Sequence, residues 1–138
     1  MPEQKKIITG CLDSHAVGTM LVSYSLEKAG FKVFRMSTLT TPEEFIKAAI
    51  EADADAILIS SVCGHGELDC RDFRSKCKEA GIGDILLYIG GNLIVGRQDW
   101  KEIESKYKAM GFDRVYPPRS DIRQAIKELE EDLRIKQS

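Results

Sequence analysis

The chain alternates short apolar segments with longer segments in which apolar residues recur at helical spacing. The short segments have the length of strands and end at charged or turn-forming residues. Two of them, 55–60 and 84–91, are apolar almost throughout, which is typical of strands buried on both faces. The expected strands are 5–10, 31–36, 55–60, 84–91 and 112–118, and the expected helices are 16/17–28, 42–53, 67–81, 98–111 and 120–135.

Several expected helix ends carry capping residues. Thr41, Pro42 and Glu44 have the spacing of a capping box with proline in the first turn. Gly30 is expected to end the first helix, and Ser120 is expected to cap the last one.

Five successive strand–helix units predict an α/β fold. Right-handed crossovers between such units give a parallel sheet with helices on both faces. A flavodoxin-like (Rossmann-type), doubly wound sheet with strand order 2-1-3-4-5 is favoured for a chain of this length. In that order the first and third strands are neighbours, and ligands bind at their C-terminal ends. No repeat, linker or low-complexity segment interrupts the pattern, so residues 1–138 are expected to form a single domain.

Composition excludes several classes of protein. The chain has 138 residues, a common size for one domain. Its 20 lysines and arginines against 22 aspartates and glutamates give a net charge of −2, and no basic run points to nucleic acid. No apolar segment approaches the roughly 20 residues of a membrane helix, and the first residues lack the apolar core of a signal peptide. A cytoplasmic protein is expected.

The four cysteines, at positions 11, 63, 70 and 77, form no CxxC pair and are expected to be thiols. Cys70 and Cys77 stand seven apart in a helical pattern. They are expected to be small buried residues on one helix face rather than members of a metal cluster.

Chemically distinctive residues gather where the first, third and fourth strands end. Asp13, His15 and Gly18 follow the first strand. The third strand ends in Ser60 and Ser61, followed by Val62, and the fourth ends in Gly90 and Gly91, followed by Asn92. Parallel strands bring their C-terminal ends to one edge of the sheet, so these residues are expected to share a site. Glycines there allow a ligand to approach the backbone.

Asp13 and His15 suit a metal site. A neutral imidazole binds a metal through one nitrogen, and a carboxylate on the other nitrogen fixes the tautomer and the ring direction. A loop histidine held by an aspartate without any metal is the alternative. A zinc site of His15, His65, Cys11 and Cys63 is a further alternative, but the spacings match no zinc signature. A metal already held inside a macrocycle would need only one histidine.

The three groups together resemble the cobalamin-binding signature DxHxxG…SxL…GG of mutases and corrinoid methyltransferases. Here Asp13-x-His15-x-x-Gly18 is followed after 41 residues by Ser60-x-Val62 and after 27 more by Gly90-Gly91. Val62 replaces the usual leucine. The stretches "DSHAVG", "SSVCGHGELDCR", "GGNLIVG" and "KAMGFDRVYPP" resemble, more closely, the small (S or sigma) subunits of the glutamate mutase (methylaspartate mutase) family.

The resemblance implies adenosylcobalamin bound base-off and His-on, with its dimethylbenzimidazole tail inserted into the domain. It implies that His15 is the lower axial ligand of cobalt and that Asp13 accepts the imidazole hydrogen bond. Ser60 would bond the tail heterocycle, Val62 would pack on it, and Gly90 and Gly91 would let the tail pass. The remaining implied cofactor-binding residues are Leu12, Ser14 and Ala16 below the corrin, Gly18 and Ser61, and Asn92, Leu93, Ile94, Val95 and Gly96 along the outer pocket.

The resemblance also implies an isomerase. The complete enzyme would interconvert (S)-glutamate and (2S,3S)-3-methylaspartate by a radical carbon-skeleton rearrangement, with this chain inactive alone. The implied partner is a larger barrel subunit, in a heterotetramer of two small and two large chains.

Four other classes of protein compete. A corrinoid methyl carrier shares the signature, but such modules usually carry a helical cap before the first strand. A signalling receiver domain needs a phosphorylatable aspartate where Ser60 and Ser61 stand. A flavodoxin needs a phosphate loop where Asp13 and His15 stand. A pure interaction module leaves the three motifs unexplained.

Overall fold

The protein folds around one parallel five-stranded sheet. The computed structural model describes residues 4–12, 17–61, 70–91, 99–117 and 120–137. The strands are β1 (Lys6–Cys11), β2 (Lys32–Arg35), β3 (Ala56–Ser61), β4 (Leu86–Gly91) and β5 (Arg114–Tyr116). Their order is β2-β1-β3-β4-β5, and every neighbouring pair is parallel. The predicted flavodoxin-like fold and strand order are confirmed.

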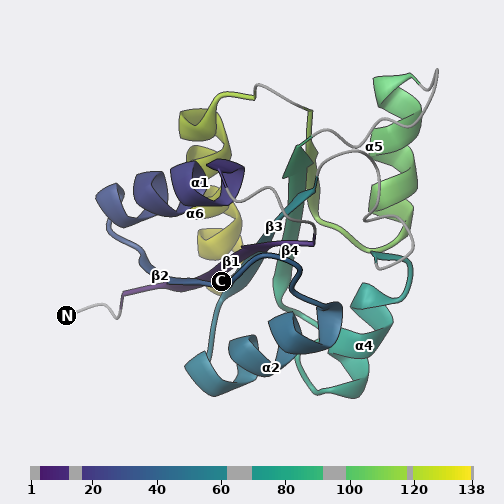
Figure 1. Ribbon diagram of the computed structural model, residues 1–138, viewed down its shortest axis with the longest axis horizontal. Coiled ribbons are helices and arrows are strands. Elements are labelled where there is room, and N and C mark those ends of the chain that lie inside the picture. The colour runs from purple at the N-terminus through teal and green to yellow at the C-terminus, as the bar shows by residue number, and fades with distance from the viewer. Residues whose placement is uncertain (1–3, 13–16, 62–69, 92–98, 118–119, 138) are drawn as a thin grey trace.

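Helices cover both faces of this sheet (Figure 1). The described helices are α1 (Val17–Lys28), α2 (Pro42–Ala52), α4 (Phe73–Glu79), α5 (Trp100–Ala109) and α6 (Ile122–Gln137). Helices α1 and α6 lie on one face, and α2, α4 and α5 lie on the other. No helix in the described ranges has both the length and the apolar content needed to cross a membrane.

The face under α2, α4 and α5 holds the larger apolar core. Phe73 lies at its centre, with ring centroids 6.1 Å from both Phe45 and Phe112. Tyr107 of α5 adds a further edge-on contact to Phe112 at 6.0 Å. Cys70 and Cys77 are fully buried in the same core, as predicted, and burial raises the pKa of Cys77 to about 11.

The face under α1 and α6 combines a smaller apolar core with a charged network. Ile7, Leu26, Tyr88 and Leu129 belong to the core. Arg114 of β5 binds Asp132 of α6 through two nitrogens, at 2.7 and 3.0 Å. It also donates to Glu128 at 2.8 Å, so α6 is fixed to the edge of the sheet by hydrogen bonds as well as by packing.

Two helix ends agree with the sequence-based predictions. Thr41 and Glu44 form the reciprocal bonds of the capping box. Gly30 has a φ of 99° just after α1, and Phe31 N–H donates to Leu26 O at 3.1 Å, which closes the helix end.

Other predicted boundaries were wrong. Asp121, not Ser120, caps α6, because its carboxylate accepts the Arg123 N–H at 2.9 Å while the Ser120 hydroxyl donates to Pro117 O. The expected helix 67–81 is interrupted by a turn at 71–72, and α4 begins at Phe73 after Asp72, a residue type that favours helix starts. Strand β5 is shorter than 112–118 because Phe112 and Asp113 precede its pairing with β4.

Candidate functional site

A single row of residues crosses the C-terminal end of the sheet. Cys11 of β1 pairs with Ser60 of β3, Ser60 pairs with Gly90 of β4, and Gly90 pairs with Tyr116 of β5. Side chains alternate along strands, and two residues before Gly90 stands Tyr88, which packs in the core under α1 and α6. The row therefore faces α1 and α6. We call Cys11, Ser60, Gly90 and Tyr116 the edge row.

The cover above the centre of the edge row is incomplete. Leu58 and Ser60, on the α1/α6 face of β3, are only half-buried. Ile57 and Ile59, on the opposite face of the same strand, are buried. A central strand of a doubly wound sheet is ordinarily buried on both faces. The side chains of Leu58 and Ser60 therefore remain partly accessible to solvent. They lie where α1 and α6 cover the ends of β3 and β4 only in part.

Gly90 keeps the edge row open beside Tyr116. A Cβ atom at Gly90 would lie 3.3 Å from the Tyr116 Cβ and 3.6 Å from the Tyr116 carbonyl oxygen. The first distance is tighter than most Cβ contacts, so a larger residue at position 90 would press on Tyr116. Gly91, one residue on, has a φ of 115°, which favours glycine.

Tyr116 is held by α6 and by its neighbour on β4. Its hydroxyl donates to Glu128 at 2.8 Å, and its ring centroid lies 5.9 Å from that of Tyr88. The Tyr88 hydroxyl donates to Asp132. Burial, reinforced by these carboxylate acceptors, raises the pKa of both phenols, so both remain neutral donors at physiological pH. Tyr116 was not predicted as a site residue, although its place at the end of a strand before two prolines was a usable signal in the sequence.

Helix α1 presents hydroxyl groups to the sheet. Thr9 and Ser23 join their hydroxyls at 2.7 Å, and the Ser23 hydroxyl donates to Thr19 O, also at 2.7 Å. Ser23 has one hydrogen, so Thr9 is the donor in the first bond. The Thr19 side chain is only 3% exposed, and its Oγ1 has no hydrogen-bond partner among the described residues.

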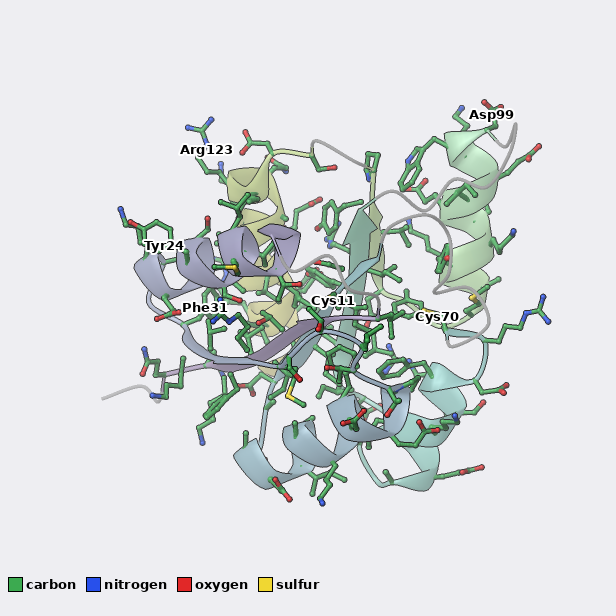
Figure 2. The ribbon with its side chains drawn as sticks, in the orientation of Figure 1. Cys11, Tyr24, Phe31, Cys70, Asp99 and Arg123 are labelled. Atoms are coloured by element: carbon green, nitrogen blue, oxygen red, sulfur yellow. The ribbon has the colours of Figure 1, made fainter. Side chains whose placement is uncertain are left out.

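The outer side of α1 is correspondingly apolar. Met20, Leu21 and Tyr24 are exposed there, and the Lys28 ammonium lies over the Tyr24 ring. Figure 2 shows Tyr24 on α1 at some distance from Cys11, which lies near the middle of the molecule where β1 ends. Leu26 of the same helix is buried in the core, so the sheet-facing side of α1 combines hydroxyl and apolar residues, while its exposed side is unusually apolar for a surface helix.

The loop after β2 reaches the same edge of the sheet. Thr40 N–H donates to Cys11 O at 3.1 Å, which holds this loop beside the end of β1. Leu39, just before it, is 65% exposed and has a φ of 57°, which is unusual for a residue with a side chain.

The structure brings together only some of the predicted site residues. Ser60 and Gly90 share the edge row, with Ser61 and Gly91 next along their strands. Leu12 is buried in the opposite core, under α2, so it does not join this row. Gly18 lies in the first turn of α1. The remaining predicted residues lie outside the described ranges: Asp13, Ser14, His15, Ala16, Val62, Asn92, Leu93, Ile94, Val95 and Gly96.

The zinc alternative receives no support from the described residues. Of its four candidate ligands only Cys11 is described, and it is buried beside Ser60. No group of three or more histidine, cysteine, aspartate or glutamate side chains in the described part of the chain is placed to hold a metal ion.

Comparisons with solved structures find the same fold in proteins of different function. A cobalamin-binding protein from Desulfitobacterium hafniense matches with a TM-score of 0.75 at 17% identity, over 94% of this chain and 59% of that one. The monomethylamine corrinoid protein of Methanosarcina barkeri matches with a TM-score of 0.71 at 20% identity, over 92% of this chain and 58% of that one. The receiver domain of the response regulator NarL from Mycobacterium tuberculosis matches with a TM-score of 0.70 at 13% identity, over 96% of this chain and 98% of that one. These similarities establish the fold alone.

Sequence comparison is more specific. No protein-family model matches the chain. The glutamate mutase sigma subunit of Carboxydothermus hydrogenoformans is 55% identical over 88% of both chains. That of Clostridium tetani is 49% identical over 97% of this chain and 99% of its own. At this identity and coverage, the chain belongs to the glutamate mutase sigma subunit family.

Proposed function

We propose that this chain is the cobalamin-holding small subunit of an adenosylcobalamin-dependent glutamate mutase. The complete enzyme interconverts (S)-glutamate and (2S,3S)-3-methylaspartate. The similarity to sigma subunits supports this function. The structural observation that carries it is the edge row, where small and polar residues replace core side chains at the C-terminal ends of the central strands.

The edge row fits the nucleotide tail of cobalamin. A flat heterocycle inserted between helix and sheet needs apolar walls, a few polar groups and close access to the backbone. Half-buried Leu58 and Ser60 provide a wall and a hydroxyl, and Gly90 provides backbone access. The Thr19 hydroxyl is buried and has no hydrogen-bond partner among the described residues, so it is available to a ligand on this face.

The proposed roles of the loop residues follow from the family resemblance. His15 would hold the cobalt, and Asp13 would accept the hydrogen of the second ring nitrogen of His15, which would fix the imidazole orientation and raise its basicity. Residues 92–96 would enclose the outer part of the tail. The bound cofactor supplies the radical chemistry, and this chain positions it.

Substrate binding is assigned to a second, larger barrel subunit. A dicarboxylic amino acid calls for cationic side chains, and the edge row contains none. The nearby cation Arg114 is already bound by Asp132 and Glu128. We propose that two small and two large chains assemble, so that the large subunit closes over the edge row and shields the reaction.

The proposal is tested by comparing the only two histidines, His15 and His65. Absorption spectra and electron paramagnetic resonance of bound cob(II)alamin should show one protein nitrogen on cobalt in the parent and in His65→Ala. His15→Ala should lose that signal. An unchanged His15→Ala spectrum would refute the ligand assignment.

Turnover distinguishes a mutase subunit from a corrinoid methyl carrier, because both bind cobalamin. The chain with adenosylcobalamin and glutamate should form no methylaspartate alone, and the large subunit of a relative should restore the reaction. Turnover by the isolated chain would contradict the division of labour.

A further inference from the structure

We propose that the Thr19 hydroxyl binds the nucleotide tail of the cofactor, as a hydrogen-bonding partner on the helix side of the site. This inference rests on the proposed function. Its starting point is the one hydroxyl on this face that is both buried and without a partner among the described residues. Burying a hydroxyl without a hydrogen bond costs free energy, so such groups are rare unless something else binds them.

The position of Thr19 in α1 explains why the helix does not satisfy it. A threonine in a helix ordinarily donates to the carbonyl three or four residues earlier. Thr19 is the third residue of α1, so those carbonyls precede the helical start at Val17. Ser23, one turn later, makes this bond to Thr19 O in the ordinary way.

The Thr9–Ser23 bond fixes which part of the sheet Thr19 faces. As a crossover helix between parallel strands, α1 runs back along the sheet, so moving from Ser23 to Thr19 means moving toward the C-terminal end of β1. One helical turn advances about 5.4 Å, and two strand residues advance about 6.6 Å. Thr19 therefore lies over Cys11, the first member of the edge row, as Ser23 lies over Thr9.

Thr19 and Ser60 then approach the same space from opposite sides. Ser60 is next to Cys11 in the edge row and is half-buried. A nucleotide between them offers a ring nitrogen, ribose hydroxyls and phosphate oxygens, and a threonine hydroxyl both donates and accepts. The corrin ring lies outside the sheet in the proposed arrangement, so the inferred bond is to the nucleotide and not to the corrin.

Thr19→Val tests the inference, because valine keeps the branched shape and removes the hydroxyl. Without cofactor, the variant should melt at a higher temperature than the parent, since an unsatisfied buried hydroxyl is gone. Its dissociation constant for adenosylcobalamin, measured by spectrophotometric titration, should rise about 10-fold through the loss of one buried hydrogen bond. A purely structural role would instead lower the melting temperature of the free chain while the dissociation constant rises.

Two controls sharpen the result. Ser23→Ala removes a hydroxyl that already has partners, so the free chain should melt at a lower temperature. Cobinamide, a corrin without the nucleotide, should bind the parent and Thr19→Val with equal affinity.

Three outcomes would overturn the inference: an unchanged dissociation constant in Thr19→Val, a lowered melting temperature of that variant, or an equal loss of affinity for cobinamide. Failure of the parent itself to bind cobalamin would instead overturn the proposed function.

Discussion

The two faces of the sheet are built on different principles. Under α2, α4 and α5, aromatic and aliphatic side chains fill the space, and Ile57, Phe73 and Leu87 are fully buried. Under α1 and α6, the same strands carry Thr9, Ser60 and Gly90 toward their C-terminal ends.

The difference shows where stability and binding are located. Apolar burial is the main source of folding free energy, and it is concentrated under α2, α4 and α5. The opposite face gives up part of that burial near its C-terminal end and relies on hydrogen bonds between α6 and β5 to hold its layer. A protein can leave a site half-open when the other face of its sheet supports the fold.

The largest expected effect is on the apolar face. Phe73→Ala removes a fully buried ring that contacts Phe45 and Phe112. The free energy of unfolding should fall by about 3–5 kcal/mol, a large part of the roughly 5–15 kcal/mol that such domains possess. Chemical denaturation measures this change, and a loss below 1 kcal/mol would contradict the assignment of the main core to this face.

An intermediate effect is expected in the network that holds α6. Asp132→Asn weakens two bonds from Arg114 and should cost about 1–2 kcal/mol at pH 7. The hydrogen bonds from Arg114 hold the pKa of Asp132 below its ordinary value. The stabilisation is therefore complete above the unfolded pKa of about 3.9 and is lost as the pH falls through the lower pKa of the folded protein.

This pH dependence provides the control. The difference in unfolding free energy between the parent and Asp132→Asn should shrink between pH 5 and the acid limit of folding. A difference that stays constant over this range would mean that the Asp132 charge contributes nothing to stability.

The smallest effect on stability is expected at the site itself. Ser60→Ala should change the free energy of unfolding by less than about 0.5 kcal/mol, because the side chain is half-buried on the incompletely covered face. Its cobalamin affinity should nevertheless fall about 5-fold through the loss of one neutral hydrogen bond. A strongly destabilised Ser60→Ala variant would place Ser60 in the core and erase the contrast between the two faces.

The parallel sheet, and the shared edge on which Ser60 and Gly90 lie, follow from features visible in the sequence, and the short chain favoured the observed strand order. Apolar runs with regular helical spacing between them specify a parallel sheet, and parallel strands necessarily bring Ser60 and Gly90 to one edge. The capping box at Thr41 is also purely local. A local motif of this kind is predictable where only one residue can fill each of its positions.

Residues whose state depends on tertiary contacts were not predictable. The start of α6 was not predictable for a different, local reason: Ser120 and Asp121 are both good capping residues, and the bond from Ser120 to Pro117 leaves Asp121 to cap the helix. The spacing in α1 gives no sign that Thr19 and Ser23 face inward while Met20 and Leu21 face outward. The inward position of Ser23 is satisfied by the hydroxyl of Thr9 on β1, which is fourteen residues away in the sequence.

The two edge strands of the sheet are poorly suited to pairing with a second copy of the chain. Strand β2 forms one margin, and its four residues include Lys32 and Arg35, with the Lys32 ammonium 5.8 Å from the centre of the Phe34 ring. Strand β5 forms the other and is only three residues long. Charged and very short edge strands are poor templates for the addition of another strand. Both edge strands therefore disfavour the edge-to-edge pairing of copies of this chain that would build a fibril.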